Sequence, residues 1–156
     1  MYERILAPLD GSKVGEAALP YVEELVSKLA PEVKVEVTLL QVVPSLTHHV
    51  VAGGADFQAP YTPEELEKIK KKAVDYLDKA GEGLRSKGAK VKTKVVVGSA
   101  AEEIIKAADK INADLIAMST HGYSGISRWA FGSITDRVLR GGDKPMLMVR
   151  ALKGTA

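Results

Sequence analysis

The sequence predicts a doubly wound α/β domain of the Rossmann type, with a five-stranded parallel sheet and helices on both faces. The first observation is that short apolar or alternating segments, typical of strands, take turns along the chain with segments whose apolar residues recur at helical spacing. Such strict alternation favours right-handed parallel crossovers that cover both faces of a sheet. The second observation is that glycine, proline or capping residues stand between these segments.

Composition and charge fit one ordinary globular domain and exclude several classes of function. The chain has 156 residues, the usual size of one domain, so we expect residues 1–156 to share one core. A formal net charge of +2 is too small to favour nucleic acid or an anionic membrane as a partner. The absence of cysteine excludes disulfides and thiolate catalysis. No apolar run approaches the roughly 20 residues that a bilayer requires, and no signal-peptide pattern opens the chain, so we expect a cytoplasmic protein.

The first strand, first helix and second strand follow from changes in the apolar period. Residues 5–9 form a continuous apolar run that stops at Asp10-Gly11-Ser12, as a buried strand does when it enters a turn. From Val14 to Leu29 the apolar residues recur at helical spacing, and Pro31 ends that helix. Residues 33–43 begin as an alternation and end fully apolar, which predicts the second strand.

A long loop and a second helix come next. Residues 44–61 carry Gly53, Gly54 and Pro60 and show no period, so we expect a long, mobile loop. Thr62-Pro63-Glu64-Glu65 is typical of a helix start, with a threonine cap, a proline at the first helical position and a glutamate that completes a capping box. One apolar face continues from there to Leu84.

The remaining elements complete the alternation. Residues 91–97 alternate with lysines, which suits a strand at an exposed sheet edge. A capping box at residues 99–102 opens a helix to about Ile111, and residues 114–118 are apolar on both faces, like a central parallel strand. A helix over 133–140 and a strand over 145–149 end the domain. These properties predict the strand order 3-2-1-4-5.

The candidate site lies at the carboxyl ends of the first and fourth strands, because open α/β sheets bind ligands where the winding direction reverses. The first strand ends in Pro8–Ser12, and the fourth ends in Met118–Gly122. The fourth leads through a segment rich in glycine and serine to Ser133, which begins a helix whose free amides attract phosphate. Alternatively, the glycines only shape a turn and Ser133 only caps the helix. The location at the reversal point favours phosphate binding.

The loop after the fourth strand resembles the nucleotide loop of the universal stress protein family. The family pattern is Gly, two residues, Gly, nine residues, then Gly and Ser or Thr. Here Ser119-Thr120-His121-Gly122 is followed by nine residues and Gly132-Ser133, so that serine stands at the first glycine position. The resemblance covers nearly the whole chain, including Arg4–Ser12, the Val97-Gly98 turn and the closing segment 144–149.

This resemblance implies an adenine nucleotide, ATP or else AMP or ADP, with Mg²⁺ or Mn²⁺. Asp10 would accept a hydrogen bond from the ribose or hold the divalent ion, although an aspartate at a strand end is also commonly a turn residue. Val42 would pack against the adenine, and the residues around the fourth strand end and Ser133 would surround the phosphates. The expected cofactor-binding residues are Pro8, Leu9, Asp10, Val42, Met118, Ser119, Thr120, His121, Gly122, Gly125, Gly132, Ser133, Ile134 and Thr135.

The implied function is an ATP-binding stress-response or regulatory module. Two alternatives stay open, a slow or partner-activated ATPase and a dimeric interaction protein that binds no nucleotide. The Walker pattern is absent and Arg128 is the only candidate arginine finger, so rapid phosphoryl transfer is not expected. His121 either contacts phosphate or holds the loop. His48 and His49 lack a visible third ligand, so the sequence predicts no metal site formed by protein side chains alone.

The last strand predicts a homodimer. Residues 145–149 are apolar and lack the lysines that protect the third strand, and an unprotected edge favours pairing with another chain. The family resemblance implies antiparallel pairing of two such strands. The alternative is that Arg150, Lys153 and the tail cover this edge. A regulatory protein partner is also expected, but the sequence does not identify it.

Overall fold

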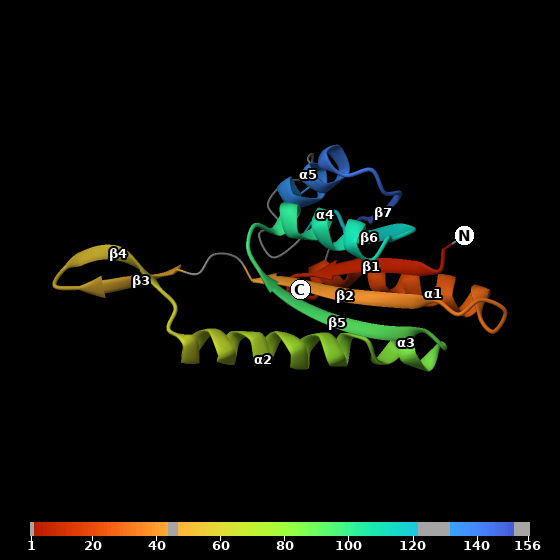
Figure 1. The fold of residues 1–156 in the computed structure, drawn as a ribbon, viewed down its shortest axis with the longest axis horizontal. Coiled ribbons are helices and arrows are strands. Elements are labelled where there is room, and N and C mark those ends of the chain that lie inside the picture. The colour runs from red at the N-terminus through yellow and green to blue at the C-terminus, as the bar shows by residue number, and fades with distance from the viewer. Residues whose placement is uncertain (1, 44–46, 122–131, 152–156) are drawn as a thin grey trace.

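The computed structural model describes residues 2–43, 47–121 and 132–151. Its main sheet has five parallel strands in the order β5 (Lys90–Val97), β2 (Glu36–Val43), β1 (Arg4–Leu9), β6 (Leu115–Ser119) and β7 (Met146–Val149) (Figure 1). Counted along the chain within this sheet, the order is 3-2-1-4-5, which confirms the predicted fold class.

Helices cover both faces of the sheet, so that two apolar layers form (Figure 1). One face carries the 3-10 helix η1 (Val14–Ala18) and the helices α1 (Leu19–Leu29), α2 (Pro63–Ala80) and α3 (Glu82–Ser86). The other face carries α4 (Ala100–Lys110) and α5 (Ser133–Gly141). Neighbouring residues of β1 show the division, because Ile5 packs in the first layer and Leu6 in the second, and both are fully buried. Burying one such side chain contributes about 1.5–3 kcal/mol to folding.

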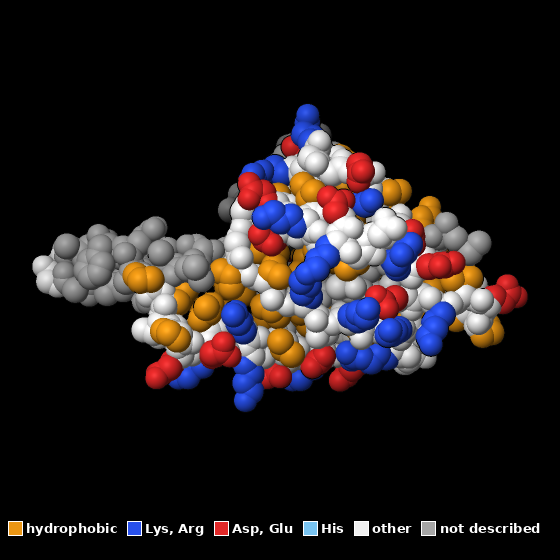
Figure 2. Space-filling view, in the orientation of Figure 1, with side chains coloured by type: hydrophobic (Ala, Val, Ile, Leu, Met, Phe, Trp, Pro, Cys, Tyr) orange, Lys and Arg blue, Asp and Glu red, His pale blue; other side chains and the backbone are white. Residues whose placement is uncertain are grey.

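The two sheet edges differ in the way that the lysine pattern predicted. Lys90 and Lys92 on the edge strand β5 both pair with Glu36 on β2, at 3.3 and 2.8 Å. Figure 2 shows basic and acidic side chains interspersed over this side of the molecule. The strand β7 at the opposite edge is short and apolar, and Met146, Leu147 and Met148 are only partly buried in the single chain.

The largest departure from the prediction is a β-hairpin where a loop was expected over residues 44–61. β3 (Thr47–Ala52) and β4 (Ala55–Pro60) pair antiparallel and project away from the main sheet (Figure 1). Gly53 and Gly54 form the turn with φ of 62° and 79°, the left-handed conformation that tight hairpin turns require. The prediction was wrong because the two glycines were interpreted as a sign of irregular structure, although Gly-Gly between two segments of equal length also predicts a hairpin.

Smaller differences occur at helix ends. The helix predicted over 14–29 starts as η1 before α1 begins, and the helix that follows Thr62 is divided at Gly81. The capping box at Thr62 is confirmed, because Thr62 Oγ1 accepts from the Glu65 amide and the Glu65 carboxylate accepts from the Thr62 amide. The second predicted box is wrong, because the Ser99 side chain makes no capping hydrogen bond.

In the described part of the chain, none of the helices combines the length and the apolar character needed to cross a bilayer.

Candidate functional site

The ends of β1 and β6 lie side by side at the carboxyl edge of the sheet. The two strands pair in parallel, with Ile5 opposite Leu115 and Leu6 opposite Ile116. Asp10 follows β1 directly, and Thr120 follows β6 directly. The start of α5 contacts the end of β6, because the Gly132 amide donates to the Thr120 carbonyl. The structure therefore brings together the two strand ends and the helix start that the sequence selected.

The turn after β1 is organised around the Asp10 carboxylate. Asp10 Oδ1 accepts hydrogen bonds from the Ser12 amide at 2.9 Å and from Ser12 Oγ at 2.6 Å. Ser12 Oγ accepts in turn from the Gly15 amide at 3.0 Å. A Cβ at Gly15 would overlap Asp10 Oδ1, so a larger residue there would displace the carboxylate from this position. Asp10 is thus a turn residue, and because it is exposed it can also meet a ligand.

The junction of β6 and α5 is buried and closely packed. Ser119, Thr120 and Thr135 are three of the four polar side chains buried in the described part of the chain. A Cβ at Gly132 would lie 2.7 Å from the Thr120 carbonyl oxygen, so only glycine allows this approach. Thr135 Oγ1 donates to the Ser119 carbonyl at 3.0 Å. The Thr135 hydroxyl therefore ties the helix to the strand, where the sequence had suggested a phosphate contact.

The N-terminus of α5 is exposed, and no side chain of the described residues caps it. Gly132 is the N-cap residue, and Ser133 is the first residue of the helix, so the idea that Ser133 serves only as a cap is wrong. Ser133 and Ile134 are exposed, the latter by 43%. Amides in the first turn of a helix lack intrahelical partners and lie at the positive end of the helix dipole. This helix start can therefore receive an anion.

His121 contacts its own neighbours in the described part of the chain. Its Nδ1 lies 2.9 Å from Thr120 Oγ1, and its amide donates to Ser119 Oγ at 3.4 Å. These contacts favour the role of holding the loop over the role of contacting phosphate.

The expected binding residues with apolar side chains divide between the two faces of the sheet. Val42 and Met118 belong to the apolar layer of α4 and α5, and Pro8 is buried on the strand between them. Leu9 is 6% exposed and packs in the opposite layer, with α1 and α2. The structure thus brings Val42 and Met118 to one face, whereas it places Leu9 in the core of the other. Gly122, Gly125 and Arg128 lie outside the described residues.

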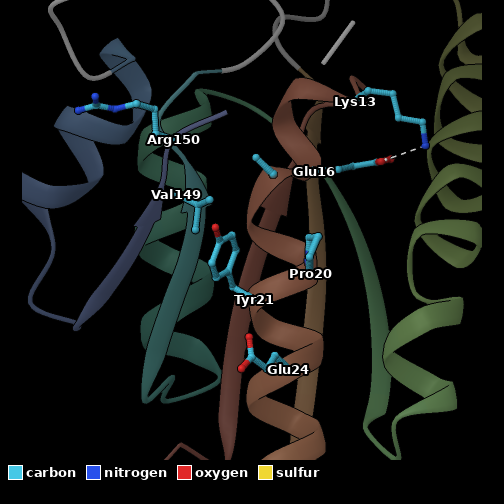
Figure 3. A pocket seen from close by; sticks show the side chains of 8 residues that line it. Lys13, Glu16, Pro20, Tyr21, Glu24, Val149 and Arg150 are labelled. Atoms are coloured by element: carbon cyan, nitrogen blue, oxygen red, sulfur yellow. Dashed lines mark hydrogen bonds and ion pairs between the residues drawn. The ribbon is translucent and has the colours of Figure 1, made fainter. Parts of the chain in front are cut away.

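Sequence reasoning missed a groove of about 530 Å³ between the first helices and β7. Its lining residues are Lys13, Glu16, Ala17, Pro20, Tyr21, Glu24, Val149 and Arg150. Figure 3 shows the Tyr21 ring beside Val149, with the Glu16 side chain directed away from that strand toward α2. Tyr21 stands among the apolar residues that recur at helical spacing from Val14 to Leu29, so that pattern does not distinguish it from a core residue, although it is 55% exposed. The groove does not coincide with the β6–α5 junction.

Sequence reasoning also missed a polar contact that links α2 to η1. Tyr76 Oη donates to Glu16 Oε1 at 3.0 Å, and Lys13 Nζ lies 3.0 Å from Glu16 Oε2. Burial raises the pKa of Tyr76 well above its usual value, and the negative charges of Glu16 and Asp10 raise it further. The phenol therefore stays protonated and remains a hydrogen-bond donor at neutral pH.

The chain is similar to known proteins over nearly its whole length. The family model described as "Universal stress protein family" matches residues 1–150. Universal stress protein MJ0577 of Methanocaldococcus jannaschii is 31% identical over 159 residues, covering 96% of each chain. The solved structure of MJ0577 has a TM-score of 0.72 to this chain at 26% identity, covering 99% of both chains.

Two more distant solved structures share the fold. A universal stress protein in complex with cAMP has a TM-score of 0.64 at 20% identity, covering 97% of this chain and 98% of that one. A universal stress protein from Archaeoglobus fulgidus in complex with dAMP has a TM-score of 0.62 at 20% identity, covering 95% of this chain and 98% of that one.

Proposed function

The chain belongs to the universal stress protein family, and from this premise we propose that it binds an adenine nucleotide, preferably ATP, at the carboxyl ends of β1 and β6. The junction of β6 with α5 carries the proposal. Gly132 packs against the Thr120 carbonyl there and is the N-cap residue of a nine-residue helix, whose start has no side-chain cap among the described residues. Uncapped first-turn amides favour a phosphate group.

The adenine base has its support on the face that α4 and α5 cover. Val42 and Met118 lie in that apolar layer near the strand ends, and Val42 is only partly buried. An apolar side chain at such a position can pack against a flat base. Two proteins of this fold are solved with cAMP and dAMP, which both carry adenine, and this supports adenine as the base.

Asp10 fits a divalent ion that accompanies the phosphates. Mg²⁺ is commonly held by one or two carboxylates together with substrate phosphates and water, and Asp10 supplies one exposed carboxylate beside the proposed phosphate site. The described residues contain no cluster of three or more side chains that could hold a metal ion. The ion would therefore enter with the nucleotide, and Mn²⁺ could replace Mg²⁺ because it accepts the same oxygen ligands.

The bound nucleotide would act as a signal in a regulatory or stress-response module. The sequence lacks the Walker pattern and a positioned general base, both of which efficient phosphoryl transfer uses. A regulatory protein partner would then distinguish the nucleotide-bound protein from the nucleotide-free protein. A slow ATPase is the alternative that phosphate release above a protein-free blank would support.

The β7 edge would form a homodimer. Its partly exposed apolar residues contrast with the ion-paired lysines of β5, and unpaired edges favour strand addition. Light scattering after size exclusion would test this, with a dimer expected at micromolar concentration. Met148→Lys places on β7 the charge that protects β5, and we expect it to shift the protein to monomer. A wild-type monomer would contradict the proposal.

A calorimetric titration tests the nucleotide. We expect Mg-ATP to bind nucleotide-free protein in the micromolar range, about −8 kcal/mol, and Mg-GTP to bind far more weakly. Ser133→Glu should weaken the binding of ATP by about 1–4 kcal/mol, because the new carboxylate repels the phosphates, and it should have little effect on the binding of adenosine. It should not lower stability, because a carboxylate suits a helix N-terminus.

Ser27→Glu is the matched control, because Ser27 is exposed on α1. It adds the same charge away from the site and should leave ATP binding unchanged. If titration with every nucleotide gives no heat of binding, the result would favour the alternative of a dimeric interaction protein that binds no nucleotide. An equal loss of ATP affinity in both variants would contradict the placement of the phosphates at α5.

A further inference from the structure

The turn that presents Asp10 is held from two sides. Within the turn, the Asp10 carboxylate accepts from the Ser12 amide, and Ser12 Oγ accepts from the Gly15 amide. Beyond the turn, Glu16 accepts a hydrogen bond from Tyr76, a residue 60 positions later in α2. Gly15 connects the two sides, because it precedes Glu16 in the chain and packs directly against the Asp10 carboxylate.

The contact between Tyr76 and Glu16 has the properties of a strong link. The donor is a neutral phenol and the acceptor is a carboxylate, and such charge-assisted hydrogen bonds are roughly twice as strong as neutral ones. The Tyr76 ring packs against the apolar layer of α1 and α2, so the hydroxyl is held in place by its own side chain. Lys13 also contacts Glu16, but the Lys13 side chain is 72% exposed, and such surface pairs contribute little.

The direction of Glu16 matches this role. Although Glu16 lines the groove beside β7, its side chain points toward α2 (Figure 3). Glu16 therefore serves mainly to connect η1 with α2, and less to line the groove.

We propose that Tyr76 and Glu16 are positioning residues, whose hydrogen bond holds η1 so that Asp10 is correctly oriented for the nucleotide. The inference rests on the proposed nucleotide function and adds to it that α2, on the α1 side of the sheet, controls the affinity of the site. Tyr76 acts through Asp10 and touches no ligand.

A first test needs no nucleotide. Amide exchange measured by NMR at Ser12 and Gly15 reports how firmly the turn is held. We expect Tyr76→Phe, which keeps the ring and removes the hydroxyl, to raise both exchange rates about fivefold, as the loss of one hydrogen bond implies. The Glu65 amide in the Thr62 capping box should not change. Tyr2→Phe is the control, because Tyr2 is exposed next to the start of β1. Unchanged exchange at Ser12 and Gly15 in Tyr76→Phe overturns the inference.

A second test uses Mg-ATP and calorimetry. We expect Tyr76→Phe and Glu16→Ala each to weaken binding about five- to tenfold, and the double variant to lose no more than either one. In an Asp10→Ala background, Tyr76→Phe should have no further effect, whereas in a Ser133→Ala background its effect should persist. If Tyr76 had only a structural role, Tyr76→Phe would weaken Mg-ATP binding by the same factor in both backgrounds. That result would overturn the inference. If the wild type binds no nucleotide, the proposed function fails, and the exchange measurement still decides whether Tyr76 holds the turn.

Discussion

The two halves of the candidate site are built in opposite ways. The β6–α5 junction is buried and depends on close backbone packing, with Gly132 against Thr120 and a buried Thr135 hydroxyl on the strand end. The Asp10 turn is exposed and depends on side-chain hydrogen bonds that span a few residues. In the proposed binding mode, the closely packed half would place the phosphates, and the exposed half would meet the ribose or an ion.

The largest expected effect comes from filling the junction. Gly132→Val would place its side chain against the Thr120 carbonyl, and overpacking of this kind costs about 1–3 kcal/mol. We expect a lower free energy of unfolding in urea and loss of ATP binding, because α5 can no longer dock. Ser133→Ala, one residue later but exposed, should leave the urea midpoint nearly unchanged. An unchanged midpoint in Gly132→Val would mean that the junction is not rigid.

The amino ends of the same strands provide the next prediction. The Asp114 carboxylate accepts from the amides of Glu3 and Arg4, at 3.0 and 2.8 Å. The Arg4 amide contributes most to lowering the pKa of Asp114 below 3.8, while its burial opposes this. Because the side chain is 27% exposed, we expect Asp114→Ala to cost only about 1–2 kcal/mol at pH 7. ATP binding should not change, because the site lies at the other end of the strands.

The pH dependence of this cost has a definite sign. The folded state lowers the pKa of Asp114, so its contribution is present above the unfolded value of 3.8 and is lost as the pH falls through the folded value. Urea unfolding at pH 7, 5 and 3 should show the difference between wild type and Asp114→Ala shrink toward the lowest pH. A constant difference would contradict this account.

A smaller effect on stability is expected at the exposed half of the site. Asp10→Ala removes the acceptor of the Ser12 amide and should lower the free energy of unfolding by only about 0.5–1 kcal/mol. The loss of ATP affinity should be larger than this, about tenfold, because Asp10 is proposed to meet the ligand. Calorimetry and urea unfolding on the same sample separate the two. An affinity loss no greater than the loss of stability would leave Asp10 as a turn residue only.

The smallest effect belongs to the β5 edge, far from either half. The hydrogen bond from Lys92, more than that from Lys90, lowers the pKa of Glu36, while its burial opposes this. The lysines are more than half exposed, so Glu36→Gln should cost at most about 1 kcal/mol and less in high salt. The measurement is urea unfolding with and without added salt. A large, salt-independent loss would indicate that this edge is part of the core.

Sequence patterns predicted the frame of the site better than its contacts. The lysines of β5 and the continuous apolar run of β6 determined the strand order, because edge and central strands need different side chains. The role of Thr135 could not be predicted, because the exact helix start decides whether its hydroxyl meets a ligand or the Ser119 carbonyl. Tyr76 shares a helix face with Ala73, so its burial was predictable, whereas its partner Glu16 was not, because no local pattern relates residues 60 positions apart.

Tyr76 also gives the molecule an optical reporter. A phenol absorbs differently once ionised, and the pKa of Tyr76 lies well above its usual value, whereas Tyr2 and Tyr21 are exposed. Because the folded state raises this pKa, the stability that Tyr76 contributes is complete below about pH 10 and declines above it. An alkaline absorbance titration should therefore show a late-ionising tyrosine that is absent in Tyr76→Phe. Ligands or partners that loosen α2 would advance that ionisation, so ultraviolet light alone could follow the state of the helix.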